Sequence, residues 1–261
     1  MGIFRRKDDN IQTGYKRDGT RQKGIPRFLE LLVRDFVDLI KLNLLFSLCV
    51  LPSVALFLLG LFAVFPAITL TLSILAAFPI GGAVTAYVFS LTSMLRDEPI
   101  SVWYDCKRKF VENWKQAMPM GIICMAVLYA QILLWGLLLQ NQSENGLIWA
   151  LVSFLTLLFF FTIAPYIFLH FAYIGIGTWQ IINNSMLMAF SSFLRSLMGA
   201  VFAGAMWLWF ALYFPFSLTI FPLMILIGFS LSLLLCLMWI WPNFDKVFQI
   251  EETLSKRKGK K

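Results

Sequence analysis

Four long stretches of this 261-residue chain contain no Asp, Glu, Lys or Arg, and they constrain its fold more than any other feature. They comprise 54, 28, 50 and 49 residues, at 42–95, 116–143, 145–194 and 196–244. A helix needs about 20 predominantly apolar residues to cross a bilayer, so each stretch is long enough for at least one span. Charged residues make up 14% of the chain, compared with about 25% in soluble domains. These observations predict an all-α fold, that of a polytopic helical membrane protein.

Breaks within these stretches divide them into six predicted spans. Pro66 and the segment Pro79–Gly82 interrupt the first stretch, and Pro215 and Pro222 interrupt the last, because proline ends or kinks a helix. The segment 172–194 contains many Gly, Asn, Gln and Ser residues and is too polar for a lipid-facing span. The predicted spans are 42–64, 68–94, 117–139, 147–170, 196–216 and 220–241. They form a single membrane domain over 25–248, between a cytoplasmic polar tail at 1–24 and a basic cytoplasmic tail at 249–261.

The distribution of basic residues predicts that both termini are cytoplasmic. With six spans, the segments on the side of the termini contain all 22 Lys and Arg residues, and the loops on the other side contain none. This arrangement follows the positive-inside rule, whereas a seventh span at 172–194 would place the basic C-terminal segment outside. We therefore attribute the net charge of +8 to contact with anionic lipid headgroups, and we expect no nucleic-acid partner.

An amphipathic segment precedes each pair of predicted spans. In the first segment, charged residues recur every three or four positions and apolar residues occupy the opposite face, which predicts a helix. The charged face comprises Arg27, Glu30, Arg34, Asp38 and Lys41, and the apolar face comprises Phe28, Leu32, Phe36 and Leu39. We expect this helix to lie in the membrane interface with its apolar face toward the lipid.

Two further segments resemble the first, which favours three tandem units. Residues 34–41 align with 108–115, with Arg, Phe, Val and Lys identical. The segment 178–195 places on one helix face Trp179, Ile182, Met186, Phe190 and Phe193. Each unit would then be an interfacial helix followed by a transmembrane hairpin. Convergence is the alternative, because spans entered from the cytoplasm commonly begin with aromatic residues and a cation.

The sequence offers few residues for chemistry. It contains no nucleophile–base set, phosphate-binding motif or metal-ligand spacing, so we expect no catalytic, cofactor-binding or metal site. Intramembrane proton relays use Asp, Glu, Lys or His, and the charge-free stretches hold one such residue, His170. We expect a neutral, hydrogen-bonded histidine near the interface.

Two groups of residues are candidate functional sites. Pro79, Gly81 and Gly82 break the second span, and unwound backbone at membrane depth must line a cavity or be buried in protein. A simple kink is the alternative at this break. Five cations near the starts of spans are the candidate contacts to lipid headgroups or to a protein partner: Arg34, Lys41, Arg108, Lys115 and Arg195.

Several short blocks are specific in combination. They are Met1–Phe4, Phe36–Leu45 leading to Leu51 and Pro52, Pro79–Tyr87, Arg96, Trp103–Phe110 and Asn113–Gln116. In these blocks the chain, from Ile25 to about Phe248, resembles the YesL family of bacterial membrane proteins, also described as domain of unknown function 624. The stretch 52–79 is longer than is usual in that family.

The resemblance implies five or six spans and no established catalytic residues. Members of this family are often encoded beside carbohydrate importers of the ATP-binding-cassette type and polysaccharide-degrading enzymes. The resemblance therefore implies a non-enzymatic protein of the bacterial cell membrane that is accessory to carbohydrate (oligosaccharide) uptake by such an importer. The alternative is a stand-alone channel or facilitator for a small solute or saccharide, with the helix break lining the path. An enzyme with a hydrophobic substrate is a third possibility.

Overall fold

A computed structural model describes residues 24–62, 66–140, 146–212, 222 and 224–258, and every regular element in these ranges is a helix. The elements are α1 (Ile25–Arg34), α2 (Phe36–Phe62), α3 (Pro66–Leu75), α4 (Ile80–Leu95), α5 (Val102–Gln140), α6 (Gly146–Tyr173), α7 (Thr178–Ser191), α8 (Phe193–Leu212), the π-helix η3 (Met224–Gly228), α10 (Phe229–Phe248) and α11 (Ile250–Lys258). The predicted all-α fold is confirmed for this part of the chain.

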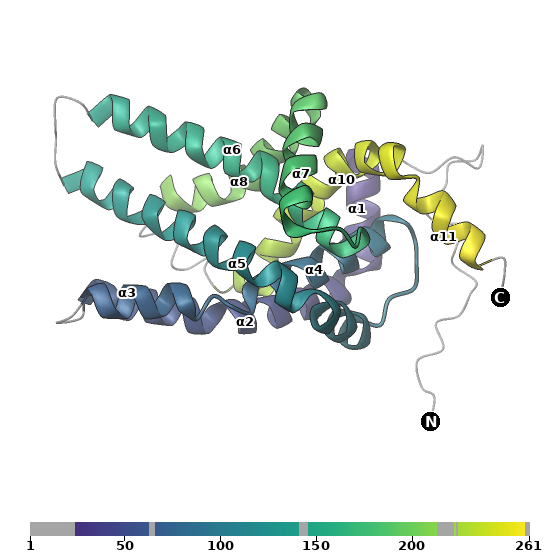
Figure 1. Cartoon of the computed structure of the whole chain (residues 1–261), viewed down its shortest axis with the longest axis horizontal. Helices are drawn as coiled ribbons and strands as arrows, with labels where there is room; N and C mark the ends of the chain where they lie inside the picture. The colour runs from purple at the N-terminus through teal and green to yellow at the C-terminus, as the bar shows by residue number, and fades with distance from the viewer. Residues whose placement is uncertain (1–23, 63–65, 141–145, 213–221, 223, 259–261) are drawn as a thin grey trace.

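Four helical segments are long and apolar enough to cross a membrane, and two bent pairs raise the number to as many as six. The four are α2, α5, α6 and the segment Leu226–Phe248, and the pairs are α3 with α4 and α7 with α8. The chain is therefore a polytopic helical membrane protein. Figure 1 shows the long helices side by side.

The second predicted span, 68–94, is two helices and not one. Helix α3 ends at Leu75, α4 begins at Ile80, and the two differ in direction by 42°. The residues between them form tight turns, in which the N–H groups of Ala77 and Phe78 donate to carbonyls three residues earlier, each at 3.1 Å. Pro79 has no N–H to donate, so the regular helical pattern cannot continue through it. The span is therefore broken next to Pro79, where the sequence predicts an interruption.

Several other helix ends differ from the predicted ones. Helix α2 begins at Phe36 and not near 42, and α5 extends over 39 residues from Val102. At 1.5 Å per residue α5 is about 58 Å long, whereas a bilayer with its headgroups is about 40–45 Å thick. The amphipathic segment before the third span is therefore the first part of the same helix. The end of the fifth predicted span, the turn between 215 and 222, and the start of the sixth span lie outside the described residues.

Each of the three proposed units contains a pair of neighbouring helices, but the amphipathic segment before the pair differs from unit to unit. Helices α2 and α3, α5 and α6, and α8 and α10 are packed as neighbouring pairs. The amphipathic segment is divided at Asp35 in the first unit, is continuous with the span in the second, and is the separate helix α7 in the third. Helix α7 turns by 99° from the beginning of α8. The threefold repeat stays a prediction.

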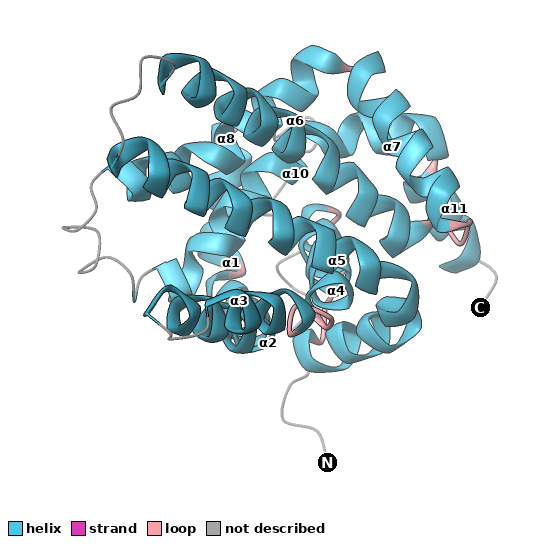
Figure 2. Ribbon diagram, turned by 60° about the vertical axis from the view of Figure 1, so that its left-hand side comes forward, coloured by secondary structure: helices cyan, strands magenta, loops and turns pink. Residues whose placement is uncertain are grey.

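One hydrophobic core joins residues from α1, α2, α4, α5, α6, α7, α10 and α11. Helix α10 is the most central span, since half of its apolar window is buried inside the protein, compared with 17% for α2 and 11% for α6. Figure 2 shows α10 behind α5 and α6 and surrounded by other helices. Most of the apolar window of α2, and of that of α6, is therefore not buried inside the protein, as in lipid-facing spans, whereas the end of α6, from Ala164 to Ala172, lies in the core.

Candidate functional site

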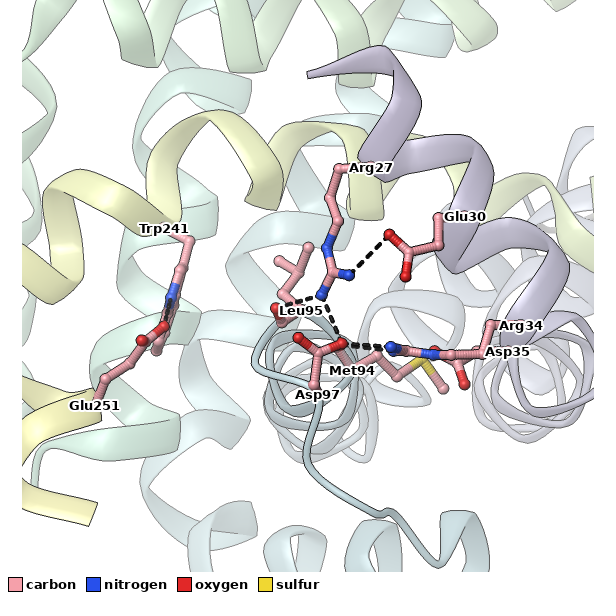
Figure 3. Close-up of polar contacts among 9 residues, drawn as sticks. All are labelled: Arg27, Glu30, Arg34, Asp35, Met94, Leu95, Asp97, Trp241 and Glu251. Carbon is pink, nitrogen blue, oxygen red and sulfur yellow. Dashed lines mark hydrogen bonds and ion pairs between the residues drawn. The ribbon is translucent and has the colours of Figure 1, made fainter. Parts of the chain in front are cut away.

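Charged side chains gather where α1 crosses the end of α4, and we call this set the ionic cluster. It consists of Arg27, Glu30, Arg34, Asp35 and Asp97. Figure 3 shows Arg27 and Arg34 extending from α1 toward Asp97, which follows the last turn of α4. The cluster therefore joins two segments that are about 60 to 70 residues apart in the sequence.

Arg27 is the most buried cation of the ionic cluster, with 3% of its surface exposed. Its Nη2 donates to Asp97 Oδ1 at 2.7 Å and to the carbonyl oxygen of Leu95 at 3.1 Å. Its Nη1 donates to Glu30 Oε2 at 3.1 Å, one turn along α1. Burial of an arginine is costly unless it is paired, and here both terminal nitrogens are paired.

Arg34 approaches the same carboxylate from the other end of α1. Its Nη1 donates to Asp97 Oδ1, and its Nη2 donates to the carbonyl oxygen of Met94 at 3.0 Å and to Asp35 Oδ2 at 2.7 Å. The last carbonyls of a helix have no partner within the helix and carry a partial negative charge. The two arginines therefore cap the C-terminal end of α4 and bind one carboxylate oxygen together.

The backbone after α4 places this carboxylate. Asp97 has a φ of 61°, in the left-handed region that Asp adopts more readily than most residues. Its N–H donates to the carbonyl of Met94 at 3.1 Å, and the N–H of Glu98 donates to that of Ser93 at 3.0 Å. These bonds end the helix in a fixed geometry and direct the Asp97 side chain toward α1.

The arginines also set the protonation of Asp97. Burial alone would raise the pKa of this carboxyl, but hydrogen bonds and charge from Arg34 and Arg27 hold its pKa below its ordinary value. Burial acts to lower the pKa of Arg34, and Asp35 and Asp97 more than reverse this effect, so its pKa is raised. The cluster holds two cations and three acidic groups, so it is an internal anchor with no excess positive charge to offer an anion.

A second arginine site lies beside the ionic cluster. The guanidinium of Arg96 is 5.2 Å from the ring centre of Tyr173 and 5.3 Å from that of Trp241, and its Nη2 donates to Glu98 Oε2 at 2.6 Å. The indole N–H of Trp241 donates to Glu251 Oε1 at 3.2 Å. Cation–π contacts of this kind are strongest when the cation is buried, as Arg96 is. These contacts connect α4, α6, α10 and α11.

Of the five predicted contact cations, Arg34 alone belongs to the ionic cluster. Its intramolecular bonds favour an internal role over the predicted contact with headgroups or a partner. The other four are exposed and lie on α2, α5 and α8. Lys41 donates to Asp38 at 3.1 Å, and Arg108 donates to Asp105 at 3.0 Å. The ammonium of Lys115 is 5.9 Å from the centre of the Trp114 ring, and Arg195 donates to Asn243.

The start of α5 carries an exposed basic and aromatic surface, which we call the α5 face. It comprises Trp103, Tyr104, Lys107, Arg108, Val111, Glu112 and Lys115. These positions repeat every three or four residues and so form one side of the helix. Three of the seven are cations and one is acidic, so the surface is positively charged.

Gly81 and Gly82 lie in the first turn of α4, directly after the break, and both are buried against α5. A Cβ at Gly81 would lie 1.9 Å from the carbonyl oxygen of Ala117, and one at Gly121 would lie 2.2 Å from the nitrogen of Gly81. The two backbones are therefore in direct contact, as small residues permit in membrane helices. The close approach of helices accounts for these glycines, and Pro79 accounts for the break.

His170 is fully buried and hydrogen-bonded, as expected. Its Nδ1 is 2.8 Å from the carbonyl oxygen of Tyr166 and 2.9 Å from the hydroxyl of Ser185. The rings of Phe244 and Phe248 contact the imidazole edge to face. These contacts make His170 part of the packing between α6, α7 and α10.

The sequence analysis did not predict one feature, a buried polar network. Asn43 Oδ1 accepts from the Tyr87 hydroxyl at 2.9 Å and from the backbone N–H of Ser230 at 2.8 Å. The hydroxyl oxygens of Tyr87 and Ser230 are 2.6 Å apart. The network links α2, α4 and the first turn of α10, next to η3. Asn43 is the single Asn in its 54-residue charge-free stretch, a signal that could have identified it.

The ionic cluster also had a signal in the sequence. Arg96, Asp97 and Glu98 follow immediately after the first charge-free stretch, where the chain leaves the membrane. Among the described residues, no group of three or more His, Cys, Asp or Glu side chains could hold a metal ion.

Comparisons with protein-family models, with curated proteins and with solved structures gave no match to this chain.

Proposed function

We propose that this chain is a non-enzymatic protein of the bacterial cell membrane, with both termini cytoplasmic, that assists carbohydrate (oligosaccharide) uptake by an ATP-binding-cassette importer. The resemblance to the YesL family supports the class of partner. The α5 face is the observation that carries the proposal, because it offers aromatic and basic side chains at an end of the bundle. Aromatic residues and arginine are the residue types that dominate protein interfaces.

Contacts of the neighbouring helices α1 and α4 hold the α5 face in a fixed position, which favours docking. The connection from α4 to α5 begins at Asp97, which the two arginines of α1 hold in place. The glycine contact between α4 and α5 fixes the direction of α5 from the other side. A surface on a rigid helix loses little conformational freedom on binding, which favours affinity.

The test is a pull-down of the tagged protein in mild detergent from its own host grown on plant polysaccharide, read by mass spectrometry. We expect importer subunits to be recovered with the unchanged protein. Replacing Lys107 and Arg108 by Glu should lower that recovery about tenfold, the effect of roughly 1.4 kcal/mol. The matched control replaces Lys41 and Arg195 by Glu, an equal change of charge on α2 and α8.

Recovery of the protein alone, with the importer intact in the same lysate, would reject the proposal. Equal loss of importer subunits with both double variants would assign the effect to overall charge and remove the α5 face from the argument.

The buried polar network favours a second candidate, a stand-alone channel or facilitator. Asn43, Tyr87 and Ser230 place polar groups inside the membrane-spanning part, beside a π-helix, an element frequent at functional sites. The test is solute flux into liposomes that contain this protein alone. Tyr87→Phe, which keeps the ring and removes the hydroxyl, should change that flux. Flux no greater than in protein-free liposomes for all saccharides and small solutes tested would reject this candidate.

A further inference from the structure

Helix α1 has its charged face toward the protein and its apolar face outward. Arg27 and Leu31 are buried, whereas Ile25, Leu29 and Val33 are 76%, 52% and 80% exposed. These three positions are four residues apart and form one stripe on the helix. The sequence predicted the opposite arrangement, with Phe28 and Leu32 toward the lipid, but both of these side chains pack partly against the protein core.

The exposed residues of α1 are all uncharged. They are Ile25, Pro26, Leu29 and Val33. A helix on the surface of a water-soluble protein turns its polar face outward and its apolar face to the core. The reversed arrangement on α1 is stable only if the medium outside this stripe is apolar.

The stripe continues into the lipid-facing side of the first span. Val37, Leu44, Leu48 and Leu51 are exposed on α2, and little of the apolar part of this helix is buried. Lys41 lies in the same row, between Val37 and Leu44, and pairs with Asp38. A lysine near the end of a span keeps its ammonium at the headgroup level while its stem lies against apolar surface.

The position of Lys41 places α1 near the boundary of the bilayer. Residues 36–41 are about 9 Å of helix, and Figure 1 shows α1 crosswise to α2 beyond this segment. A helix that lies along the membrane surface buries its apolar face about 5–10 Å into the region between headgroups and acyl chains. The distance of about 9 Å along the helix from Lys41 to the end of α1 is consistent with this depth.

We propose that α1 lies along the membrane surface with Ile25, Leu29 and Val33 against lipid acyl chains, held in this orientation by the ionic cluster. Arg27 and Arg34 bind Asp97 and the end of α4, which fixes the rotation of α1 about its own axis. The continuity of the stripe with the exposed apolar row of α2 favours lipid over a protein as its occupant. This inference does not depend on the importer or the channel.

Photo-crosslinking identifies the occupant directly. The photoreactive amino acid p-benzoylphenylalanine is placed singly at Leu29 or Val33, and the protein is reconstituted in vesicles of phosphatidylethanolamine and phosphatidylglycerol. Leu48, a residue of the lipid-facing row on α2, is the positive control. Phe28 is the matched control on α1, because it is aromatic and lies on the partly buried face. After irradiation, the mass of each adduct identifies what was captured.

We expect lipid adducts at Leu29 and Val33 with yields within about threefold of that at Leu48, and a yield at Phe28 about tenfold lower. Gel filtration of each variant before irradiation shows that it is folded. A crosslink to a second copy or to another protein at Leu29 would overturn the proposal. Absence of any adduct at Leu29 and Val33, with a lipid adduct at Leu48, would place the stripe in water and overturn it equally.

Discussion

Replacing Gly121 by Ala should destabilise the protein by separating α4 from α5. The added Cβ would lie 2.2 Å from the nitrogen of Gly81 and 2.7 Å from its Cα, and both are backbone atoms that no side-chain rotation can move. The helices would have to separate by about 1 Å to restore an ordinary contact of 3.4 Å. A gap of 0.5–1 Å removes about a quarter to a half of the dispersion energy of each atom pair across it.

The same helix contains a matched control. A Cβ at Gly136 meets no atom within 4 Å, so Gly136→Ala changes only the helix propensity, by up to about 1 kcal/mol in favour of alanine. Overpacking of a tight contact costs about 1–3 kcal/mol. We therefore expect Gly121→Ala to lower the free energy of unfolding by about 1–3 kcal/mol and Gly136→Ala to leave it unchanged or raise it slightly.

The assay is reversible unfolding of the purified protein in mixed micelles, as the fraction of denaturing detergent is increased. Gly81→Ala introduces a Cβ 1.9 Å from the carbonyl oxygen of Ala117, and the same separation of the two helices relieves both clashes. The double variant Gly81→Ala with Gly121→Ala should therefore lose less stability than the sum of the two single changes. Equal stability of Gly121→Ala and Gly136→Ala, or full additivity in the double variant, would refute this account of the contact.

Three further predictions concern the polar contacts. Asp97→Asn should lower the free energy of unfolding by about 1–3 kcal/mol at neutral pH. Because the two arginines lower the pKa of Asp97, the difference from the unchanged protein should be constant above about pH 5, should decrease only below about pH 4, and should disappear once the pH is below the lowered pKa. Asn43→Ala should cost about 1–3 kcal/mol in the micelle assay, since it leaves the buried N–H of Ser230 without its acceptor. Tyr129→Phe should cost less, about 0.6 kcal/mol, because Ser53 keeps its second hydrogen bond, to a backbone carbonyl; a larger loss for this variant than for Asn43→Ala would contradict the ranking.

The sequence predicts helix positions well where hydrophobicity alone decides them. The fourth span, predicted at 147–170, is helix Gly146–Tyr173, because apolar residues fill the whole helix and a polar stretch of sequence precedes it. The first span was predicted to begin at 42, where the charges end, but α2 begins at Phe36. Backbone hydrogen bonds continue through charged residues, and the pair of Lys41 with Asp38 on adjacent turns supports this continuation.

The candidate site was harder to predict than the spans. Its position near the start of a span made Arg34 a candidate contact to headgroups or a partner, but in the structure its side chain bonds to Asp97, 63 residues away. A single sequence contains no information on which of several charged residues near a membrane surface will meet. The two glycines next to Pro79 were attributed to unwinding because glycine permits it. Their actual role requires a second helix at contact distance, which periodicity within one span cannot reveal.

The reversed face of α1 has a general physical reason. Helical periodicity shows that a segment has a charged and an apolar face, and for a soluble protein the apolar face is the inner one. In a membrane protein the surroundings of a surface helix include acyl chains, so hydrophobicity no longer separates inside from outside. The strongest remaining preference belongs to the charges, because ion pairs and helix carbonyls stabilise a buried arginine in a way that lipid cannot. Arg27 and Arg34 find these partners at the end of α4, and the apolar stripe of α1 is left to the lipid.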